Sequence, residues 1–292
     1  MKVLIFGATG FLGQEICNLF KLQNVDYATV SRTESADFKI NIANYNDFEI
    51  LPNDFTTVIN CATTLPGNNY LDGEYLEKIY QSNILGSQNI CKWIYGQKNI
   101  TKIINCSTMV VANKPWKIDI DENANTYPTG NHVLYCGSKL MQELLFDTFA
   151  KEHNIDLVQL RFSTIYGNNM AWSGIICNFI DQAKNYNKIE LSNGEKVSAD
   201  FLNVIDAARI IMAAIEKNVV GIINAASGTE TFLVDLANIV AENFQNCKVV
   251  NFNHVPEIEE NRSVINTTKL SEIIDISSFI SLENGIKKML KP

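Results

Sequence analysis

Apolar runs alternate with segments of helical periodicity through the first half of the chain. Residues 3–6 form a short apolar run that ends at a glycine, as in a buried parallel strand, and residues 11–20 follow with apolar side chains at helical spacing. The alternation continues with predicted strands at 26–32, 56–62, 101–107 and 156–162, and with predicted helices at 70–95 and 134–151. Strands separated by crossover helices predict an α/β fold.

The second half is less regular and predicts a smaller lobe. Gly and Asn turn signals follow Tyr166, and two further helices are predicted at 204–217 and 231–245. We therefore expect a Rossmann-like, doubly wound parallel sheet in residues 1–165, to which part of 200–225 returns, and a C-terminal lobe that comprises mainly residues 166–292.

Composition is that of a globular protein, with 46% hydrophobic and 19% charged residues among 292. No apolar run reaches the roughly 18 residues that a membrane span needs, and the short apolar N-terminus lacks the features of an export signal. A net charge of −8 disfavours nucleic acid as a partner. We expect a soluble cytoplasmic protein with neither a membrane nor a nucleic-acid partner.

Seven cysteines are spread along the chain without a CxxC pair or a Cys/His cluster at metal-ligand spacing. Most have apolar neighbours, as buried cysteines usually do. They predict reduced thiols and no metal site.

A glycine-rich turn opens the chain between the first predicted strand and the first predicted helix. The stretch GATGFLG places Gly7, Gly10 and Gly13 where small residues let backbone amides and a helix N-terminus approach a pyrophosphate. A glycine triplet alone also suits a tight turn, but its position after a strand and before a helix indicates dinucleotide binding.

The end of the second predicted strand bears on which dinucleotide binds. NAD-preferring sites place an acidic residue there for the ribose hydroxyls, whereas this strand ends with Ser31 and Arg32. A guanidinium and a hydroxyl can bind a 2′-phosphate that a carboxylate would repel. We therefore favour NADP(H), with NAD(H) as the alternative and a solvated arginine as the simpler explanation of Arg32.

Three residues form a candidate catalytic set at the carboxyl edge of the predicted sheet. Ser107 ends the strand at 101–107, and Tyr135 lies four residues before Lys139 on the next predicted helix. A free phenol has a pKa of about 10, and a nearby ammonium lowers it by favouring the phenolate. We expect Lys139 to have this effect on Tyr135.

The chain resembles, over nearly its whole length, the extended short-chain dehydrogenase/reductase family, in particular its nucleotide-sugar-modifying epimerase/dehydratase branch. Several ordered motifs carry this resemblance. They are GATGFLG (7–13), VINCAT (58–63), SNILGSQNI (82–90), CSTMVVA (106–112), YCGSK (135–139), LRFSTIYG (160–167) and DFLNVIDAA (200–208).

The resemblance implies a role for each matched position. Tyr135 would be the general acid and base, Ser107 would hold the substrate oxygen beside Thr108, Lys139 would bind the nicotinamide ribose, and Asn83 would steady the site. The residues that would line the dinucleotide are Phe11, Leu12, Cys61 and Ala62. The resemblance also suggests a homodimer through the helices at 70–95 and 134–151.

Departures from the family pattern narrow the reaction. Dehydratases carry an acidic pair directly after the Ser/Thr of the fourth-strand motif, whereas this chain has Thr108 and Met109, which cannot act as carboxylic acids. Ala199 replaces an arginine that often binds the substrate diphosphate, which leaves Arg262, before Lys269 of the "T-K-L" segment, as the candidate for this role or for a surface salt bridge. Asn41 replaces the usual aspartate near the adenine.

The function expected from these residues is NADPH-dependent reduction of a 4-keto-6-deoxy nucleotide sugar. Arg32 favours this reaction over the first alternative, an NAD-dependent nucleotide-sugar 4-epimerase. A non-catalytic NAD(P)-binding sensor is the second alternative, although such proteins usually lose the Tyr/Lys pair. Neither the sugar, nor the nucleotide base, nor the product stereochemistry follows from the sequence.

Overall fold

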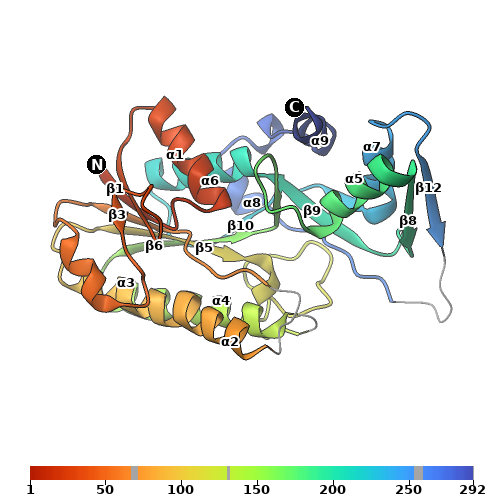
Figure 1. Cartoon of the computed structure of the whole chain (residues 1–292). Helices are drawn as coiled ribbons and strands as arrows, with labels where there is room; N and C mark the ends of the chain where they lie inside the picture. Colours follow the sequence, from red (N-terminus) through yellow and green to blue (C-terminus); the bar gives the residue numbers. More distant parts are fainter. Residues whose placement is uncertain (67–71, 130–131, 253–258, 292) are drawn as a thin grey trace. The chain divides into compact units, whose positions relative to one another are not determined.

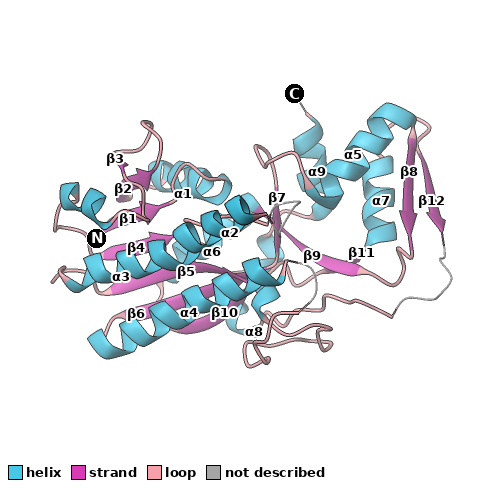
Figure 2. Cartoon of the chain, turned by 60° about the horizontal axis from the view of Figure 1, so that its bottom comes forward, coloured by secondary structure: helices cyan, strands magenta, loops and turns pink. Residues whose placement is uncertain are grey.

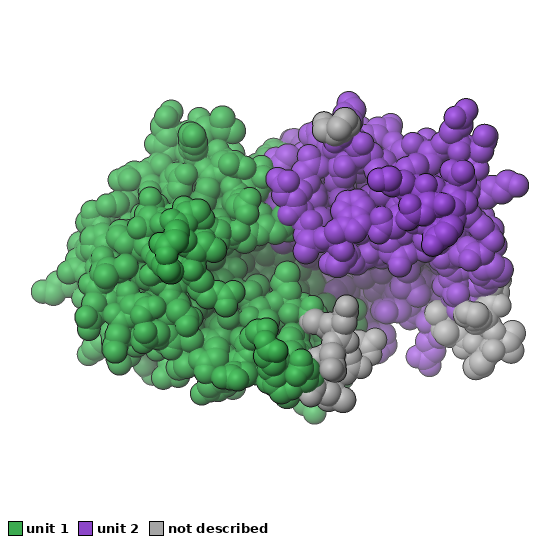
Figure 3. Space-filling view, viewed as in Figure 1, with its two compact units in different colours: residues 1–114, 122–162, 208–223 green, residues 115–121, 163–207, 224–292 purple. Residues whose placement is uncertain are grey.

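The computed structural model describes residues 1–66, 72–129, 132–252 and 259–291. The chain divides into two compact units, which Figure 3 distinguishes by colour. Unit 1 comprises residues 1–114, 122–162 and 208–223, and unit 2 comprises residues 115–121, 163–207 and 224–292.

Unit 1 is built on the seven-stranded sheet of the chain, whose strand order is β10-β6-β5-β4-β1-β2-β3 (Figure 1). Every neighbouring pair from β3 to β6 is parallel. The strands are β1 (Lys2–Phe6), β2 (Asp26–Ser31), β3 (Phe38–Lys39), β4 (Thr57–Asn60), β5 (Lys102–Thr108), β6 (Asp156–Phe162) and β10 (Gly221–Ala225). The expected Rossmann-like sheet is confirmed, and the strand order reverses at β1, where such folds bind ligands at the carboxyl edge.

Helices cover both faces of this sheet. Figures 1 and 2 show α2, α3 and α4 along one face and α1 and α6 along the other. Their bounds are α1 (Phe11–Leu22), α2 (Gly73–Ile79), α3 (Gly86–Tyr95), α4 (Val133–His153) and α6 (Val204–Glu216), with short 3-10 turns at Tyr45–Ile50 and Met109–Val111. The core between α3, α4 and the sheet holds Phe6, Trp93 and Phe146, each at most 5% exposed.

The helix expected at 70–95 is interrupted. Residues 70 and 71 lie outside the described residues, α2 ends at Ile79, and a π-helical segment, Tyr80–Leu85, leads into α3. Apolar spacing does not reveal such a widened turn, because it changes the backbone hydrogen bonds and not the residue types. Turns of this kind are frequent at functional sites.

Unit 2 contains a three-stranded sheet, β11-β9-β7, and a parallel pair, β12-β8. These strands are β7 (Thr164–Tyr166), β8 (Lys188–Ser192), β9 (Ser198–Asn203), β11 (Glu230–Phe232) and β12 (Lys248–Phe252), and the helices are α5 (Gly174–Tyr186), α7 (Leu233–Ala241), α8 (Thr268–Ser271) and α9 (Leu282–Leu290), with a 3-10 turn at Ile276–Ser278. Phe179, Leu236 and Ile286 are at most 1% exposed and belong to one apolar core.

No helix within the described ranges is long and apolar enough to cross a membrane. The same ranges contain no group of three or more His, Cys, Asp or Glu side chains that could hold a metal ion.

Candidate active site

The glycine turn between β1 and α1 has no room for a side chain at two of its three glycines, Gly7 and Gly13. Gly7 has a φ of +79°, and a Cβ there would lie 2.6 Å from the backbone nitrogen of Ala62. A Cβ on Gly13 would lie 2.3 Å from the Gly7 carbonyl oxygen, whereas one on Gly10 would meet only that oxygen, at 3.2 Å. The sequence therefore folds this turn tightly against the end of β4 and leaves the backbone at Gly10 approachable.

The N-terminus of α1 fits a pyrophosphate. Gly10 is its N-cap residue, and no side chain caps the helix or places an acid in its first turn. The first backbone N–H groups of a helix have no partner within it, and together with the helix dipole they favour an anion. Phe11 and Leu12 begin this helix and are half-buried beside the turn.

A cavity of about 210 Å³ adjoins the glycine turn. Its lining includes Gly7, Thr9, Gly10, Ser31, Arg32, Thr33, Asn41, Cys61, Ala62 and Thr63. This lining contains residues that the sequence predicted to contact the cofactor, and none of its side chains carries a carboxylate. A backbone cradle for a pyrophosphate, a guanidinium and several hydroxyl groups fit a dinucleotide bound along this edge of the sheet.

Residues at the end of β2 and directly after it, Ser31, Arg32 and Thr33, line this cavity. The Ser31 hydroxyl is linked to the Thr33 hydroxyl at 2.8 Å, which is linked in turn to that of Ser35 at 2.9 Å. Arg32 is exposed and forms no hydrogen bond or ion pair with the rest of the described chain. Asn41 accepts a hydrogen bond from the Ala43 backbone through Oδ1, so its Nδ2 donor remains for an adenine.

Tyr135 lies in the first turn of α4 and is only 8% exposed. It belongs to an apolar cluster with Tyr75 and Ile79 of α2, and its hydroxyl forms no hydrogen bond with another described residue. Burial, and secondarily the neighbouring Cys136 and Tyr75, raise the Tyr135 pKa above its ordinary value. The expectation that Lys139 lowers this pKa is wrong for this arrangement, because the ammonium is engaged elsewhere. The Tyr135 phenol therefore keeps its proton in this arrangement.

Lys139 lies one turn further along α4 and is 2% exposed. Its Nζ donates to the Cys106 carbonyl oxygen at 2.7 Å and to Oε1 of Gln142. Burial lowers the Lys139 pKa to about 8, although nearby Cys106, Glu143 and Cys61 act in the opposite direction. One of its three N–H donors is left for a ligand.

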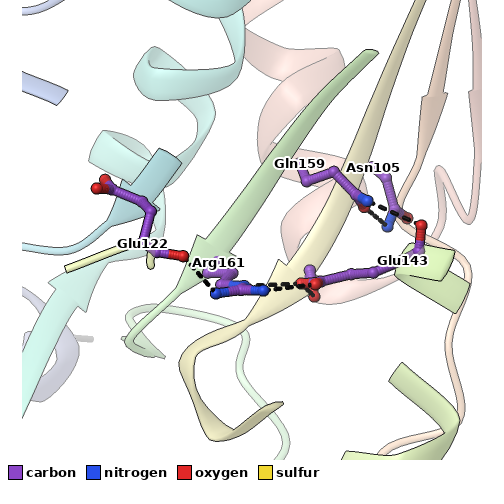
Figure 4. Close-up of polar contacts among 6 residues, drawn as sticks. Asn105, Glu122, Glu143, Gln159 and Arg161 are labelled. Atoms are coloured by element: carbon purple, nitrogen blue, oxygen red, sulfur yellow. Dashed lines mark hydrogen bonds and ion pairs between the residues drawn. The ribbon is translucent and has the colours of Figure 1, made fainter. Parts of the chain in front are cut away.

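Ser107 lies at the carboxyl end of β5, directly opposite Arg161 of β6 in the strand register. Its hydroxyl donates to Oε1 of Glu143, whose carboxylate also receives the Nε and Nη2 groups of Arg161 at 3.0 and 2.8 Å. Figure 4 shows Glu143 and Arg161 facing each other, with the Glu122 carbonyl accepting from Nη1. Because a serine hydroxyl has only one hydrogen and Glu143 accepts it, Ser107 in this arrangement can accept a hydrogen bond from a hydroxyl group.

An amide ladder beneath the site positions Glu143. Asn60 donates to Asn105 at 3.1 Å, Asn105 donates to Gln159 at 2.8 Å, and Gln159 donates to the Glu143 backbone carbonyl at 2.9 Å. The last two bonds are visible in Figure 4. All four residues are buried, so this ladder crosses β4, β5 and β6 and fixes α4 above their ends.

Asn83, on the π-helical segment, connects that segment to both α4 and the loop after β4. Its Oδ1 accepts from the Thr64 backbone at 2.7 Å and from the Thr63 hydroxyl at 3.1 Å, while its Nδ2 donates to Ser138 at 2.9 Å. The amide is fully buried, so Asn83 steadies the loop whose Thr63 lines the cavity.

Cys61 and Cys106 lie side by side, with their sulfur atoms 3.2 Å apart and both thiols free. The hydrogen bond to Cys106 and burial raise the Cys61 pKa well above its ordinary value, so this thiol is neutral at physiological pH. Cys61 and Ala62 contribute uncharged walls to the cavity.

The remaining predicted site residues serve local structure. The Thr108 hydroxyl accepts from the Val110 backbone and caps the short turn that follows β5. Arg262 of unit 2 forms a bidentate ion pair with Glu230, at 2.8 and 2.6 Å. Asp200, next to Ala199, is buried and accepts from Ser163 and Ser227. The position that often carries a diphosphate-binding arginine therefore has none, and Arg262 is engaged.

Sequence reasoning missed three buried polar residues around the catalytic set: Gln142, Glu143 and Arg161. A signal for Glu143 was present, because Tyr135, Lys139 and Glu143 follow one another at four-residue spacing on one helix face. Gln142 lies three residues after Lys139, a spacing that also places two side chains on one helix face.

Comparison with known proteins agrees with this geometry. Residues 3–226 match the model of the NAD dependent epimerase/dehydratase family. The chain belongs to this family. Its members are enzymes that use NAD(P), and the cavity at the glycine turn has the residues to hold such a dinucleotide.

Curated relatives are distant in sequence but extend over most of the chain. The dTDP-4-dehydro-6-deoxyglucose reductase of Escherichia coli is 22% identical over 99% of this chain and 96% of its own length. Protein CapI of Staphylococcus aureus is 26% identical over 74% of this chain and 70% of its own length.

Solved structures share the fold. The UDP-glucuronic acid 4-epimerase of Bacillus cereus, in complex with UDP-glucuronic acid and NAD, has a TM-score of 0.82 at 22% identity and covers 99% of this chain and 98% of its own. The UDP-glucose 4-epimerase of Thermus thermophilus, in complex with NAD, has a TM-score of 0.78 at 20% identity, with coverages of 99% and 97%.

Proposed function

We propose that this enzyme reduces the keto group of a 4-keto-6-deoxy nucleotide sugar with NADPH. The observation that carries this proposal is Arg32, which lines the cofactor cavity beside Ser31 and Thr33 in a lining without a carboxylate. A 2′-phosphate would gain charge-assisted hydrogen bonds there, and an exchangeable NADP(H) suits net reduction better than a tightly held NAD. The similarity to the reductase of Escherichia coli supports the same reaction.

The proposed mechanism assigns a proton to Tyr135 and an acceptor to Ser107. NADPH, when bound, would supply the hydride to the keto carbon. Tyr135, whose pKa is raised by burial, would deliver its proton to the keto oxygen as negative charge develops there. The new hydroxyl could then donate to Ser107, whose own hydrogen is held by Glu143. Lys139 would bind the nicotinamide ribose through its remaining N–H.

Dehydration is disfavoured by the residues after Ser107. Thr108 and Met109 carry no carboxylic acid, and the Thr108 hydroxyl caps the adjacent turn. The site therefore lacks the acid that would protonate a leaving hydroxyl at this position.

The alternative is an NAD-dependent nucleotide-sugar 4-epimerase on the same residues. The observation that favours it is the fold similarity to 4-epimerases solved with NAD. The two reactions differ in whether the cofactor leaves between turnovers.

One experiment separates them. Purified protein is desalted, its bound nucleotide is identified, and NADPH consumption is followed with a 4-keto-6-deoxy nucleotide sugar. Reduction predicts NADPH consumption that Tyr135→Phe lowers by about 10²- to 10⁴-fold while NADPH binding persists. Retained NAD with no NADPH consumption would refute the reductase proposal.

We also propose a homodimer through α2, α3 and α4. Apolar side chains exposed on these helices support it, notably Leu76, Met141 and Leu144, together with Tyr80 of the π-helical segment between α2 and α3. Light scattering after size exclusion tests it, since Leu144→Glu should shift the protein to the monomer.

A further inference from the structure

The buried Lys139 ammonium has no carboxylate of its own. The charged and titratable groups that face it are Cys106 on β5, Cys61 after β4 and Glu143 on α4. The Glu143 carboxylate already accepts hydrogen bonds from Ser107 and Arg161. Lys139 is held by two neutral acceptors, the Cys106 carbonyl and the Gln142 side chain.

Gln142 is itself held in place. It is 0% exposed, and while its Oε1 accepts from Lys139, its Nε2 donates to the Ser87 hydroxyl at 2.8 Å. The side chain therefore has one orientation, because a flipped amide would direct an NH₂ group at an ammonium.

Ser87 extends this chain of hydrogen bonds to the π-helical segment. Its hydroxyl donates to the Asn83 carbonyl oxygen at 2.8 Å, and Ser87 is also fully buried. The same Asn83 holds the loop after β4 through its side chain. Lys139 and the cofactor-lining Thr63 thus share one rigid support.

We propose that Gln142 is a positioning residue, which holds the Lys139 ammonium in its ribose-binding orientation and joins it through Ser87 to the turn at Asn83. The proposal rests on the role of Lys139 in dinucleotide binding, and only in that respect on the proposed function. A hydrogen bond from an ammonium to a neutral acceptor favours the charged form, so Gln142 also opposes the desolvation of Lys139.

Dinucleotide binding tests this inference without a sugar substrate. The dissociation constant of NADPH, and of NADH in parallel, is measured by fluorescence from about pH 6.5 to about pH 10, where binding weakens as Lys139 loses its proton. This loss should be centred near 8 in the unmodified protein, the value to which burial lowers the Lys139 pKa. Cys61 stays neutral over most of this range because its pKa is raised.

Two substitutions should move the midpoint in opposite directions. Gln142→Leu removes the acceptor and should lower the midpoint by about one pH unit, while Gln142→Glu adds a negative charge and should raise it by about one pH unit or more. Ser87→Ala leaves the acceptor but removes its anchor, and should give a smaller downward shift. Gln88→Leu, at an exposed position of α3, is the matched control and should leave the midpoint unchanged.

Opposite shifts support the inference, and an unchanged midpoint or a shift of equal sign in both Gln142 variants overturns it. If Gln142→Leu does not fold, the direction of the Gln142→Glu shift decides alone. If the unmodified protein binds dinucleotides but reduces no keto sugar, the proposed reduction fails while this measurement still stands.

Discussion

Arg161 and Lys139 are two buried cations whose surroundings differ in kind. Arg161 is 3% exposed and Lys139 is 2% exposed. Glu143 forms a bidentate ion pair with Arg161, and the Glu122 carbonyl oxygen accepts a hydrogen bond from Arg161 Nη1. Lys139 meets only neutral acceptors and has a lowered pKa. The Arg161 charge is therefore neutralised within the fold, whereas the Lys139 charge is buried without a carboxylate partner at a cost in stability.

The largest effect on stability should come from breaking the buried ion pair between Glu143 and Arg161. Glu143→Gln leaves the Arg161 charge buried without its counter-charge, which should reduce the free energy of unfolding by about 3–5 kcal/mol. Urea unfolding measures this as a lower midpoint at an unchanged slope.

Asp147→Asn is the matched control on the same helix. Asp147 pairs with Lys151 at the surface at 2.7 Å, and such exposed pairs contribute less than about 1 kcal/mol. Equal losses in the two variants would mean that the Glu143–Arg161 pair is not what stabilises this region.

The next largest effect is a pH dependence of the free energy of unfolding, and it comes from the buried Lys139 ammonium. The Lys139 pKa is about 8 in the folded protein and 10.5 as the ordinary value, so between these values the unfolded chain binds more protons. The cost of burying Lys139 is therefore fully present below pH 8 and is relieved as the pH rises. The free energy of unfolding of the unmodified protein minus that of Lys139→Met should therefore rise by about 1.4 kcal/mol per pH unit above about pH 8.

Urea unfolding at several pH values checks this slope. Tyr135 and Cys61 are present in both proteins, and their raised pKa values act in the opposite direction. A difference that stays flat would show that Lys139 is not an unpaired buried charge.

The contrast between these cations also marks how far the sequence can be interpreted. The sheet, the glycine turn and the positions of Tyr135, Lys139 and Ser107 follow from periodicity and ordered motifs, because local patterns determine them. The contacts of Gln142 with Ser87 and of Arg161 with Glu143 could not be predicted, since they depend on how α4 packs against α3 and β6. The π-helical segment could not be predicted either, because a widened turn changes the backbone hydrogen bonds and not the residue types.

The direction in which the Tyr135 pKa shifts could not be predicted from the sequence either. The four-residue spacing to Lys139 suggested that an ammonium would lower it, but spacing does not report desolvation or the other acceptors that compete for a donor. Burial raises this pKa, and the Lys139 N–H groups point to Cys106 and Gln142.

Arg32 is a third cation and, unlike Arg161 and Lys139, it is exposed. Arg32 has no partner in the described part of the chain and lines the cavity. Arg32→Ala should raise the dissociation constant of NADP⁺ by about 10- to 100-fold and that of NAD⁺ by less than about threefold, because only NADP⁺ has the 2′-phosphate. Calorimetry measures both constants, and Lys39→Ala, at another exposed cation nearby, is the control. Equal changes for both nucleotides would remove the basis for preferring NADP(H).

The smallest effect should come from releasing a cation that is paired but accessible. Arg262 is engaged by Glu230, and its side chain is 34% exposed, so this pair is held far less firmly than Arg161 and Glu143. Glu230→Gln removes the counter-charge, keeps the size of the side chain and leaves Arg262 free to meet a diphosphate. Binding of UDP or dTDP, followed by calorimetry, should tighten by about threefold to tenfold, as expected for removing one partly solvated competitor.

Glu242→Gln, which makes the same change of net charge at an exposed position, should leave this affinity unaltered. The double variant Glu230→Gln/Arg262→Gln should lose the gain, because the guanidinium would no longer be present. If Glu230→Gln tightens nothing, Arg262 belongs with Arg161 among the cations committed to structure, and the diphosphate must be bound by other residues.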